Sequence, residues 1–80
     1  MPERGCKIVQ VRWTPADSFE TIESFGGSLE EAKRVADGYL MSRRIRGTLQ
    51  WVEGEPDQNG PVHWGHLIGH GRGITIRIKQ

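Results

Sequence analysis

Hydrophobic and polar residues alternate with a period of two over residues 7–13 and 18–25, which is the pattern of a half-buried β-strand. The first stretch is also rich in the β-branched and aromatic types that favour strands. The side chains expected on one face are Val9, Val11 and Trp13 in the first stretch and Phe19, Thr21 and Phe25 in the second. Because Pro15 lies in a turn-forming segment between them, the two stretches predict a β-hairpin.

After Gly26 and Gly27 the hydrophobic spacing changes to three and four, which is typical of an amphipathic helix. The apolar stripe of this helix consists of Leu29, Ala32, Val35, Ala36, Tyr39 and Leu40. Ser28 and Glu31 have the spacing of a capping box, so the helix is expected to begin directly after Ser28. Arg43 and Arg44 would face the negative end of the helix dipole, and Gly47 is the residue expected just beyond the helix.

The period returns to two in the second half of the chain and predicts three more strands, over residues 48–53, 62–68 and 74–79. A turn-rich segment with Asn59-Gly60 separates the first two of them, and a glycine-rich connection precedes the last. The side chains expected to face together are Leu49 and Trp51 in the first strand, Val62, Trp64 and Ile68 in the second, and Ile74, Ile76 and Ile78 in the third.

The predicted fold class is α+β, with the order β-β-α-β-β-β in a single domain over residues 1–80. Short connections favour an antiparallel sheet, here of four to five strands with one amphipathic helix on one face. One helix leaves the opposite face of the sheet uncovered, as a solvent-exposed or contact surface. The residues expected there are Gln10, Arg12, Thr75, Arg77 and Lys79, with Ile8, Ile22, Val52 and Leu67 among them.

Composition narrows the class of protein. With 80 residues, 35% hydrophobic and 26% charged, the chain has the balance of a small globular domain. Cys6 is the single cysteine, so no disulfide can form within the chain, which fits a reducing compartment. No signal-peptide pattern and no apolar run long enough for a membrane span is present. We therefore expect a cytoplasmic protein that does not act in a membrane.

The net charge is only +1, but acidic and basic residues are segregated along the chain. Residues 17–31 hold five acidic residues and no basic residue, whereas residues 42–47 and 71–80 hold only basic ones. Arginine offers a planar set of donors that suits phosphate and carboxylate groups. The expected partner-binding residues are Arg12, Arg43, Arg44, Arg46, Arg72, Arg77 and Lys79.

Three histidines, His63, His66 and His70, lie within eight positions and raise the question of a metal site. Nearby prolines and glycines oppose a helix that would bring them to one face, and in a strand His63 and His66 point to opposite faces. The sequence therefore predicts no metal and no cofactor, with these three residues as the alternative ligand set. Nucleophile elbows, P-loops and Cys-x-x-Cys pairs are absent, so we expect a protein that is not an enzyme.

Residues 7–40, KIVQVRWTPADSFETIESFGGSLEEAKRVADGYL, resemble the ββα arm-binding module of phage-type tyrosine recombinases. That resemblance implies a strand pair that reads DNA, although Glu20 and Glu23 stand where such a strand should be basic. Over its whole length the chain resembles, in size and organisation, small phage and mobile-element inhibitors such as anti-CRISPR proteins. This second resemblance implies a stoichiometric inhibitor that blocks a nucleoprotein machine by surface contact.

Taken together, these patterns predict a non-enzymatic binding protein that occupies a surface of a larger protein or nucleoprotein complex. Direct binding of nucleic acid is the first alternative, and metal binding through the three histidines is the second. A homodimer formed through the uncovered face or an edge strand is also compatible with the predicted sheet.

Overall fold

The structure is a computed structural model that describes residues 6–69 and 73–80. Arg72 and His70, two residues of interest in the sequence, lie outside the described residues. The elements in chain order are β1 (Cys6–Arg12), β2 (Glu20–Gly26), α1 (Leu29–Ser42), β3 (Thr48–Glu53), β4 (His63–Ile68) and β5 (Thr75–Lys79). This order and the α+β class confirm the prediction from the sequence.

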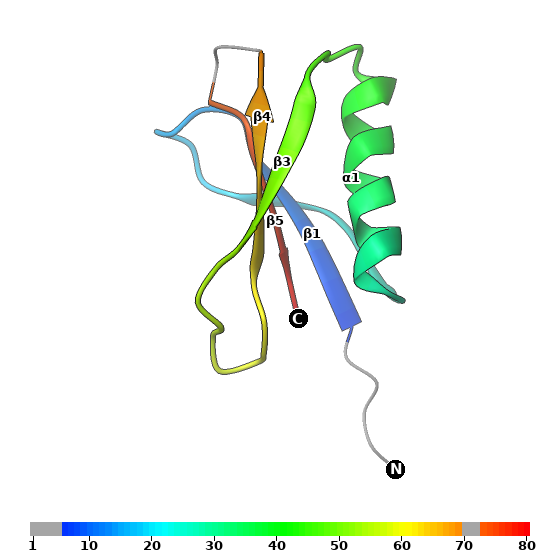
Figure 1. Ribbon diagram of the computed structural model, residues 1–80, viewed down its shortest axis with the longest axis vertical. Helices are drawn as coiled ribbons and strands as arrows, with labels where there is room; N and C mark the ends of the chain where they lie inside the picture. Colours follow the sequence, from blue (N-terminus) through cyan, green and yellow to red (C-terminus); the bar gives the residue numbers. More distant parts are fainter. Residues whose placement is uncertain (1–5, 70–72) are drawn as a thin grey trace.

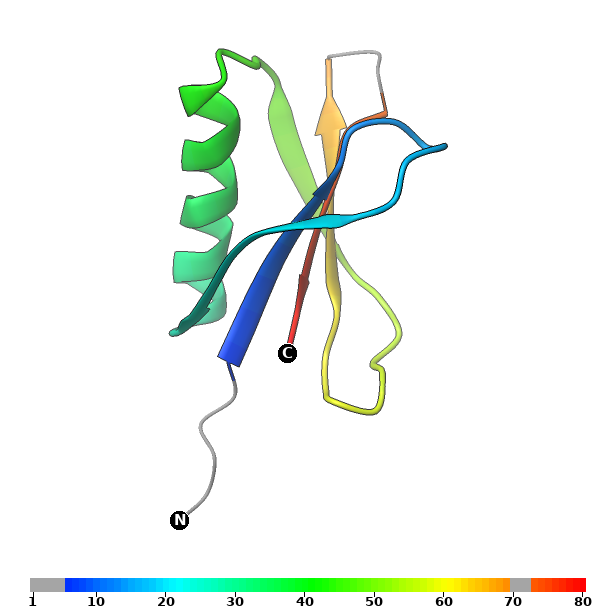
Figure 2. The same cartoon turned by 180° about the vertical axis from the view of Figure 1, so that it is seen from behind.

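The five strands form one antiparallel sheet in the order β2-β1-β5-β4-β3. The last strand of the chain, β5, is therefore central and pairs with β1 on one side and β4 on the other. Its position explains the regular alternation of its sequence, because a central strand must bury one side chain in every two. Figure 1 shows α1 lying along one side of the sheet, and Figure 2, the view from the opposite side, shows β2 (cyan) crossing in front of β1 (blue).

The core lies between α1 and the two strands β1 and β5. The helix contributes small side chains where it meets the sheet, and these let the two layers approach closely. The strands contribute β-branched side chains that are almost completely buried. The core residues with at most 3% exposure are Val9, Val11, Ala32, Ala36, Leu40, Ile74, Ile76 and Ile78.

Both ends of α1 are closed by local hydrogen bonds. At the start, the Glu31 amide donates to Ser28 Oγ at 3.1 Å and the Ser28 amide donates to Glu31 Oε1 at 2.9 Å, so the predicted capping box is confirmed. At the other end the amides of Arg44 and Ile45 donate to the carbonyls of Met41 and Leu40, at 2.9 and 3.0 Å. These two bonds are those of a Schellman motif.

The Schellman motif corrects the predicted helix end. The left-handed position belongs to Arg44, with φ of 60°, and not to Gly47, which has φ of 140° in the turn before β3. Gly47 was expected to end the helix on residue type alone. The helix instead ends at Ser42, because closing it there lets Ile45, which packs against the core, follow directly after Arg44.

Two residues predicted on the uncovered face lie elsewhere. Leu67 is 9% exposed and belongs to the core cluster, whereas its neighbour Ile68 is 53% exposed, so β4 has the opposite orientation to the one predicted. The reason is Gly65: a Cβ there would come within 2.8 Å of the Trp51 ring, so this inward-facing glycine makes room for the ring. Ile22 packs against the core because a bulge opposite Val9 and Gln10 interrupts the alternation of β2.

Within the described residues, no helix is long and apolar enough to cross a membrane.

Candidate partner-binding face

The candidate site is the sheet face that α1 does not cover, which we call the open face. Strand pairing sets Arg12 opposite Thr75, Gln10 opposite Arg77 and Trp64 opposite Arg77. Cross-strand partners share a face of the sheet, so these side chains stand together across β1, β5 and β4. The open face consists of Ile8, Gln10, Arg12, Thr48, Gln50, Val52, Trp64, His66, Ile68, Thr75, Arg77 and Lys79.

At the centre of the open face two guanidinium groups lie against one aromatic ring. The Cζ atoms of Arg77 and Arg12 lie 4.2 and 4.9 Å from the centroid of the Phe19 ring. The Phe19 ring in turn meets Trp64 edge-on at 5.8 Å, and Arg77 lies 5.7 Å from the Trp64 ring. Such contacts favour a cation, because the face of an aromatic ring carries partial negative charge. We call these four residues the Arg12–Arg77 cluster.

Hydrogen bonds fix Arg77 within this cluster. Its Nε donates to Gln10 Oε1 at 2.8 Å, and the Gln10 amide nitrogen donates to Thr21 Oγ1 at 3.3 Å. This chain links β5, β1 and β2 and holds the guanidinium in one orientation. The Nε of Arg12 is buried and has no hydrogen-bond partner among the described residues. A buried donor without a partner is costly, so the placement of this nitrogen is unfavourable in the structure.

The cluster holds two like charges, and no carboxylate of the described residues lies within 4.0 Å of either one. Partial burial, followed by the charge of Arg12, lowers the pKa of Arg77, while the carboxylate of Asp57 raises it; the net shift is downward. Arg77 nevertheless stays charged near neutral pH because a guanidinium titrates far above it. Over residues 6–69 and 73–80, the single ion pair that meets a 4.0 Å limit joins Lys33 to Glu30 on α1. Neither arginine of the cluster is therefore neutralised by a carboxylate there.

This arrangement suits a negatively charged group from outside. An anion placed beside Arg12 and Arg77 would offset their mutual repulsion and accept hydrogen bonds from terminal guanidinium nitrogens. The apolar side chains of Val52 and Ile68, which are 50% and 53% exposed, border the same face. Arginine and tryptophan next to exposed apolar surface are the residue types that dominate binding energy at protein interfaces.

The three predicted arginines after the helix are not part of this face. Arg43 lies 4.8 Å from the Tyr39 ring and 5.8 Å from the Trp13 ring, and Arg44 occupies the left-handed position of the helix end. Arg46 lines a groove between α1 and β3. We call Arg43, Arg44 and Arg46 the helix-end arginines. Each has a different local environment, so the structure separates them from the Arg12–Arg77 cluster.

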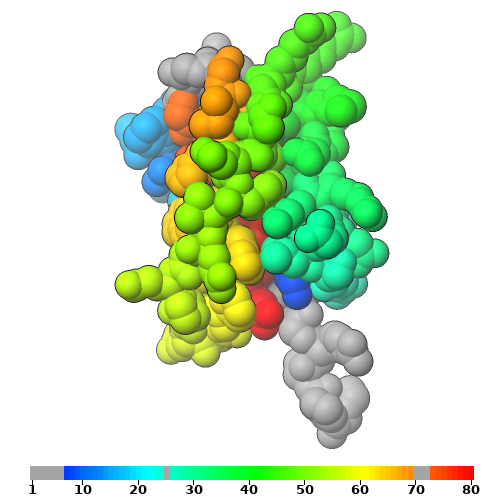
Figure 3. Space-filling view, in the orientation of Figure 1, coloured from blue at the N-terminus to red at the C-terminus, as the bar shows by residue number. Residues whose placement is uncertain are grey.

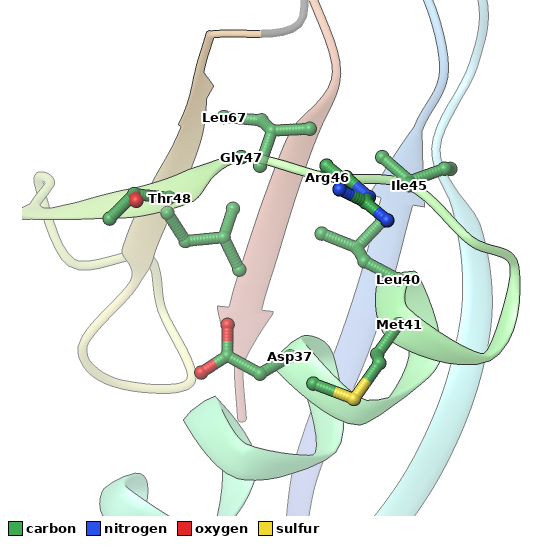
Figure 4. Close-up of a pocket in the computed structure, with 9 residues that line it drawn as sticks. Asp37, Leu40, Met41, Ile45, Arg46, Gly47, Thr48 and Leu67 are labelled. Carbon is green, nitrogen blue, oxygen red and sulfur yellow. The ribbon is translucent and has the colours of Figure 1, made fainter.

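That groove has a volume of about 610 Å³. Figure 4 shows Asp37 and Met41 reaching into it from α1, with Thr48 and Leu67 on the strand side. Its full lining is Asp37, Leu40, Met41, Ile45, Arg46, Gly47, Thr48, Leu49 and Leu67. The groove exists because α1 packs against β1 and β5 and leaves β3 and β4 partly uncovered.

The remaining predicted residues fall outside a common site. Lys79 is on the open face but at its far end, beside a hollow of about 210 Å³ that His63 and Gln80 also line. Within β4, His63 and His66 stand three positions apart and so point to opposite faces, as predicted. In the described part of the chain, no group of three histidine, cysteine or acidic residues is placed to hold a metal ion.

Phe19 is the site residue that the sequence did not identify. It was expected in a strand, yet β2 begins at Glu20 and Phe19 belongs to the connection from β1. A phenylalanine just before a strand gives no signal of a contact with arginines on two other strands. Gln10 and Arg12 were predicted on the open face. The pairing of β1 with β5 sets Gln10 opposite Arg77 and Arg12 opposite Thr75.

No protein-family model, curated protein or solved structure matches this chain.

Proposed function

We propose that this chain is a small non-enzymatic binding protein that occupies a surface of a larger protein or nucleoprotein complex. The open face makes the contact, and the Arg12–Arg77 cluster receives an acidic side chain of the partner. In size and organisation the chain resembles stoichiometric inhibitors of phage origin, such as anti-CRISPR proteins, and we propose the same mode of action. Blocking a surface needs shape and charge complementarity but no reactive group.

The observation that carries the proposal is the pair of guanidinium groups held on one phenylalanine ring, with no ion pair to a carboxylate among residues 6–69 and 73–80. The lowered pKa of Arg77 indicates that its charge is unfavourable where it stands. A partner that brings negative charge to this pair would relieve that cost. It would therefore bind more tightly here than to two arginines on a flexible, fully solvated surface. Arg77 is already oriented by Gln10, so less side-chain entropy is lost on binding.

The neighbourhood of the cluster favours a protein partner over bare nucleic acid. Glu20 and Glu23 are exposed on the edge strand β2, opposite Val11 and Val9 and therefore on the helix side of the sheet, so a phosphate backbone that extended from the open face around this edge would meet negative charge. Val52 on β3 and Ile68 on β4 offer exposed apolar contact area toward the opposite edge of the open face. A net charge of +1 is also low for a protein that binds nucleic acid through its backbone.

The test compares two charge reversals that change the net charge equally, Arg77→Glu on the open face and Arg34→Glu on the exposed side of α1. The full chain, tagged, captures partners from an extract of its native host with and without nuclease. A protein captured in both conditions is then purified and titrated against each variant by calorimetry. We expect one-to-one binding that Arg77→Glu abolishes and Arg34→Glu preserves.

Two results would contradict the proposal. One is a purified partner that binds both variants equally, which would place the contact elsewhere. The other is the absence of any protein that binds the wild-type chain at a defined stoichiometry. Circular dichroism of both variants shows whether a lost interaction reflects a lost fold.

Direct binding of nucleic acid is the second candidate function, favoured by the Phe19 and Trp64 rings beside two guanidinium groups. Aromatic rings next to arginine are a common platform for the bases of single strands. A mobility shift with a generic single-stranded oligonucleotide at low salt discriminates the two functions. Strong binding that weakens linearly with the logarithm of salt concentration would favour nucleic acid, whereas no shift favours the protein partner.

A further inference from the structure

The two edge strands of the sheet differ in how well they are protected from pairing with another chain. At one edge, β2 carries the exposed residues Glu20 and Glu23 and a bulge opposite Val9 and Gln10. Charges and bulges are the devices by which proteins prevent edge strands from pairing further. At the other edge, β3 pairs with β4 without a register shift and has one charged residue, Glu53, at its end.

We infer that β3 pairs with β3 of a second copy of this chain, so that two sheets join edge to edge in an antiparallel homodimer. This inference does not rest on the proposed partner or on the Arg12–Arg77 cluster. Figure 3 shows β3 forming the near surface of the molecule in that view, beside α1.

The backbone of β3 has unpaired groups available for this purpose. The Gly54 amide, which follows the strand, donates to the Val62 carbonyl at 2.8 Å, so Gly54 faces β4. Successive residues of a strand alternate the direction of their amide and carbonyl groups. The groups of Leu49, Trp51 and Glu53 therefore point outward, away from β4, where no strand lies among the described residues.

Symmetry limits the register of such a pair. In an antiparallel pair related by a twofold axis, opposing residues must lie on the same face of the sheet, so their numbers must add to an even value. With Gln50 on the axis, Leu49 of each copy faces Trp51 of the other on the helix side. Thr48 of each copy faces Val52 of the other on the open side. This register gives the half-exposed Val52 and the half-buried Trp51 apolar or β-branched neighbours.

Charge complementarity supports the same register. Glu53 of each copy is set opposite Gly47 of the other, next to Arg46, so each end of the joint ladder brings one acid beside one base. The next allowed register, with Trp51 on the axis, would instead set Glu53 against Leu49. The apolar groove beside Leu49 also favours the first register, because the second copy's Trp51 then lies at its mouth.

The dimer would have a defined geometry. A twofold axis perpendicular to the sheet keeps both helices on one side and both open faces on the other. The two Arg12–Arg77 clusters would then face the same direction, and each could bind its own partner molecule.

The experiment uses a cysteine at the twofold axis. Gln50 is exposed and would oppose its own copy at a non-hydrogen-bonded position, where Cα atoms lie about 4.5 Å apart and a disulfide can form. In a Cys6→Ser background, Gln50→Cys is expected to form a covalent dimer under mild oxidation. Thr21→Cys, on the protected edge strand β2, is the matched control and is expected to form no covalent dimer under the same conditions.

Light scattering during size-exclusion chromatography tests the dimer without a crosslink. The wild-type chain of 9.0 kDa is expected to elute at twice that mass and to dissociate on dilution. Val52→Lys places a charge on the exposed side of β3 and is expected to shift the protein to the monomer, whereas Thr21→Lys leaves it dimeric. A monomeric wild type at every concentration, or equal crosslinking of Gln50→Cys and Thr21→Cys, would overturn the inference. Neither result bears on the Arg12–Arg77 cluster, so failure here is distinct from failure of the proposed function.

Discussion

The chain carries two groups of arginines, and their surroundings differ. The helix-end arginines are exposed and follow one another in sequence, and two of them have roles in the fold: Arg43 packs on Tyr39 and Arg44 closes the helix. Arg12 and Arg77 are 65 positions apart, share one aromatic ring and are partly buried without a carboxylate partner. The first group is the clearer run of charge in the sequence, whereas the second sets two like charges beside each other on one ring, which is the basis of the proposed binding site.

The difference shows why a run of positive charge is a weak signal of function. Charges at a helix C-terminus stabilise the helix through its dipole, so their presence is explained without a ligand. Two guanidinium groups that repel each other on a sheet face have no such explanation.

The strongest contrast comes from paired charge reversals in the two groups. Arg12→Glu with Arg77→Glu is expected to weaken partner binding by at least about 100-fold, because losing a desolvated charged contact costs about 2–5 kcal/mol. Arg43→Glu with Arg46→Glu changes the net charge equally and is expected to weaken binding by less than about threefold, as peripheral charges do. Calorimetric titration of the purified partner measures both. Equal losses would show that total charge, and not the cluster, determines binding.

Removing the ring beneath the two guanidinium groups tests whether the aromatic support matters. Phe19→Ala is expected to lower the free energy of unfolding by about 2 kcal/mol, since it deletes a half-buried ring and its contact with Trp64. Phe19→Leu keeps much of the apolar volume and is expected to lower it by less than about 1 kcal/mol. Both variants lose the contact with the cations and should weaken partner binding. Urea denaturation gives the stabilities, and normal binding by Phe19→Leu would exclude a role for the ring.

An uncompensated pair of cations should respond to a simple anion. Inorganic phosphate at about ten times its dissociation constant is expected to stabilise the wild-type chain by about 1.4 kcal/mol. Arg12→Gln with Arg77→Gln should remove that increment, whereas Arg43→Gln with Arg46→Gln should keep it. Thermal unfolding at constant ionic strength measures the effect. The same stabilisation in all three proteins would indicate a general salt effect without a specific site.

The smallest effect concerns the helix end. Arg44→Gly is expected to raise the free energy of unfolding by about 0.5–1 kcal/mol, because glycine adopts a φ of 60° without the strain that arginine experiences there. Arg44→Ala removes the charge but keeps the strain, so its stability should stay close to that of the wild type. Denaturant titration compares the three. If Arg44→Ala raised the free energy of unfolding as much as Arg44→Gly, the gain would come from removing the charge and not from relieving the strain.

Much of the fold followed from the hydrophobic pattern because each element has a local signal. The capping box at Ser28 located the helix start, and the alternating isoleucines of β5 identified its buried face. The inversion of β4 could not be predicted, since it depends on Trp51 packing over Gly65 from a neighbouring strand. The helix end was predicted wrongly because residue type favours Gly47 as the position just beyond the helix. The packing of Ile45 against the core instead places the end of the helix at Ser42.

Only part of the candidate site could be predicted, because the sequence shows local patterns but not contacts between distant segments. Arg12 and Arg77 were both expected on the uncovered face, because strand alternation and pairing of the first and last strands place them there. Their contact with Phe19 could not be predicted, since it joins three segments that are distant in sequence. The helix-end arginines were grouped with them because a sequence shows charge but not the position of a charge relative to the sheet.

The most direct test of the open face is nuclear magnetic resonance of the arginine side chains during titration with a short polyglutamate peptide. The Nε–H signals of Arg12 and Arg77 are expected to shift and saturate together, while those of Arg34 and Arg43 stay close to their starting positions. The same titration with Arg77→Lys should give a weaker and non-saturating shift at Arg12, because lysine lacks the planar donor pair. Shifts that are largest at Arg43, Arg44 and Arg46, or equal at all arginines, would contradict the account.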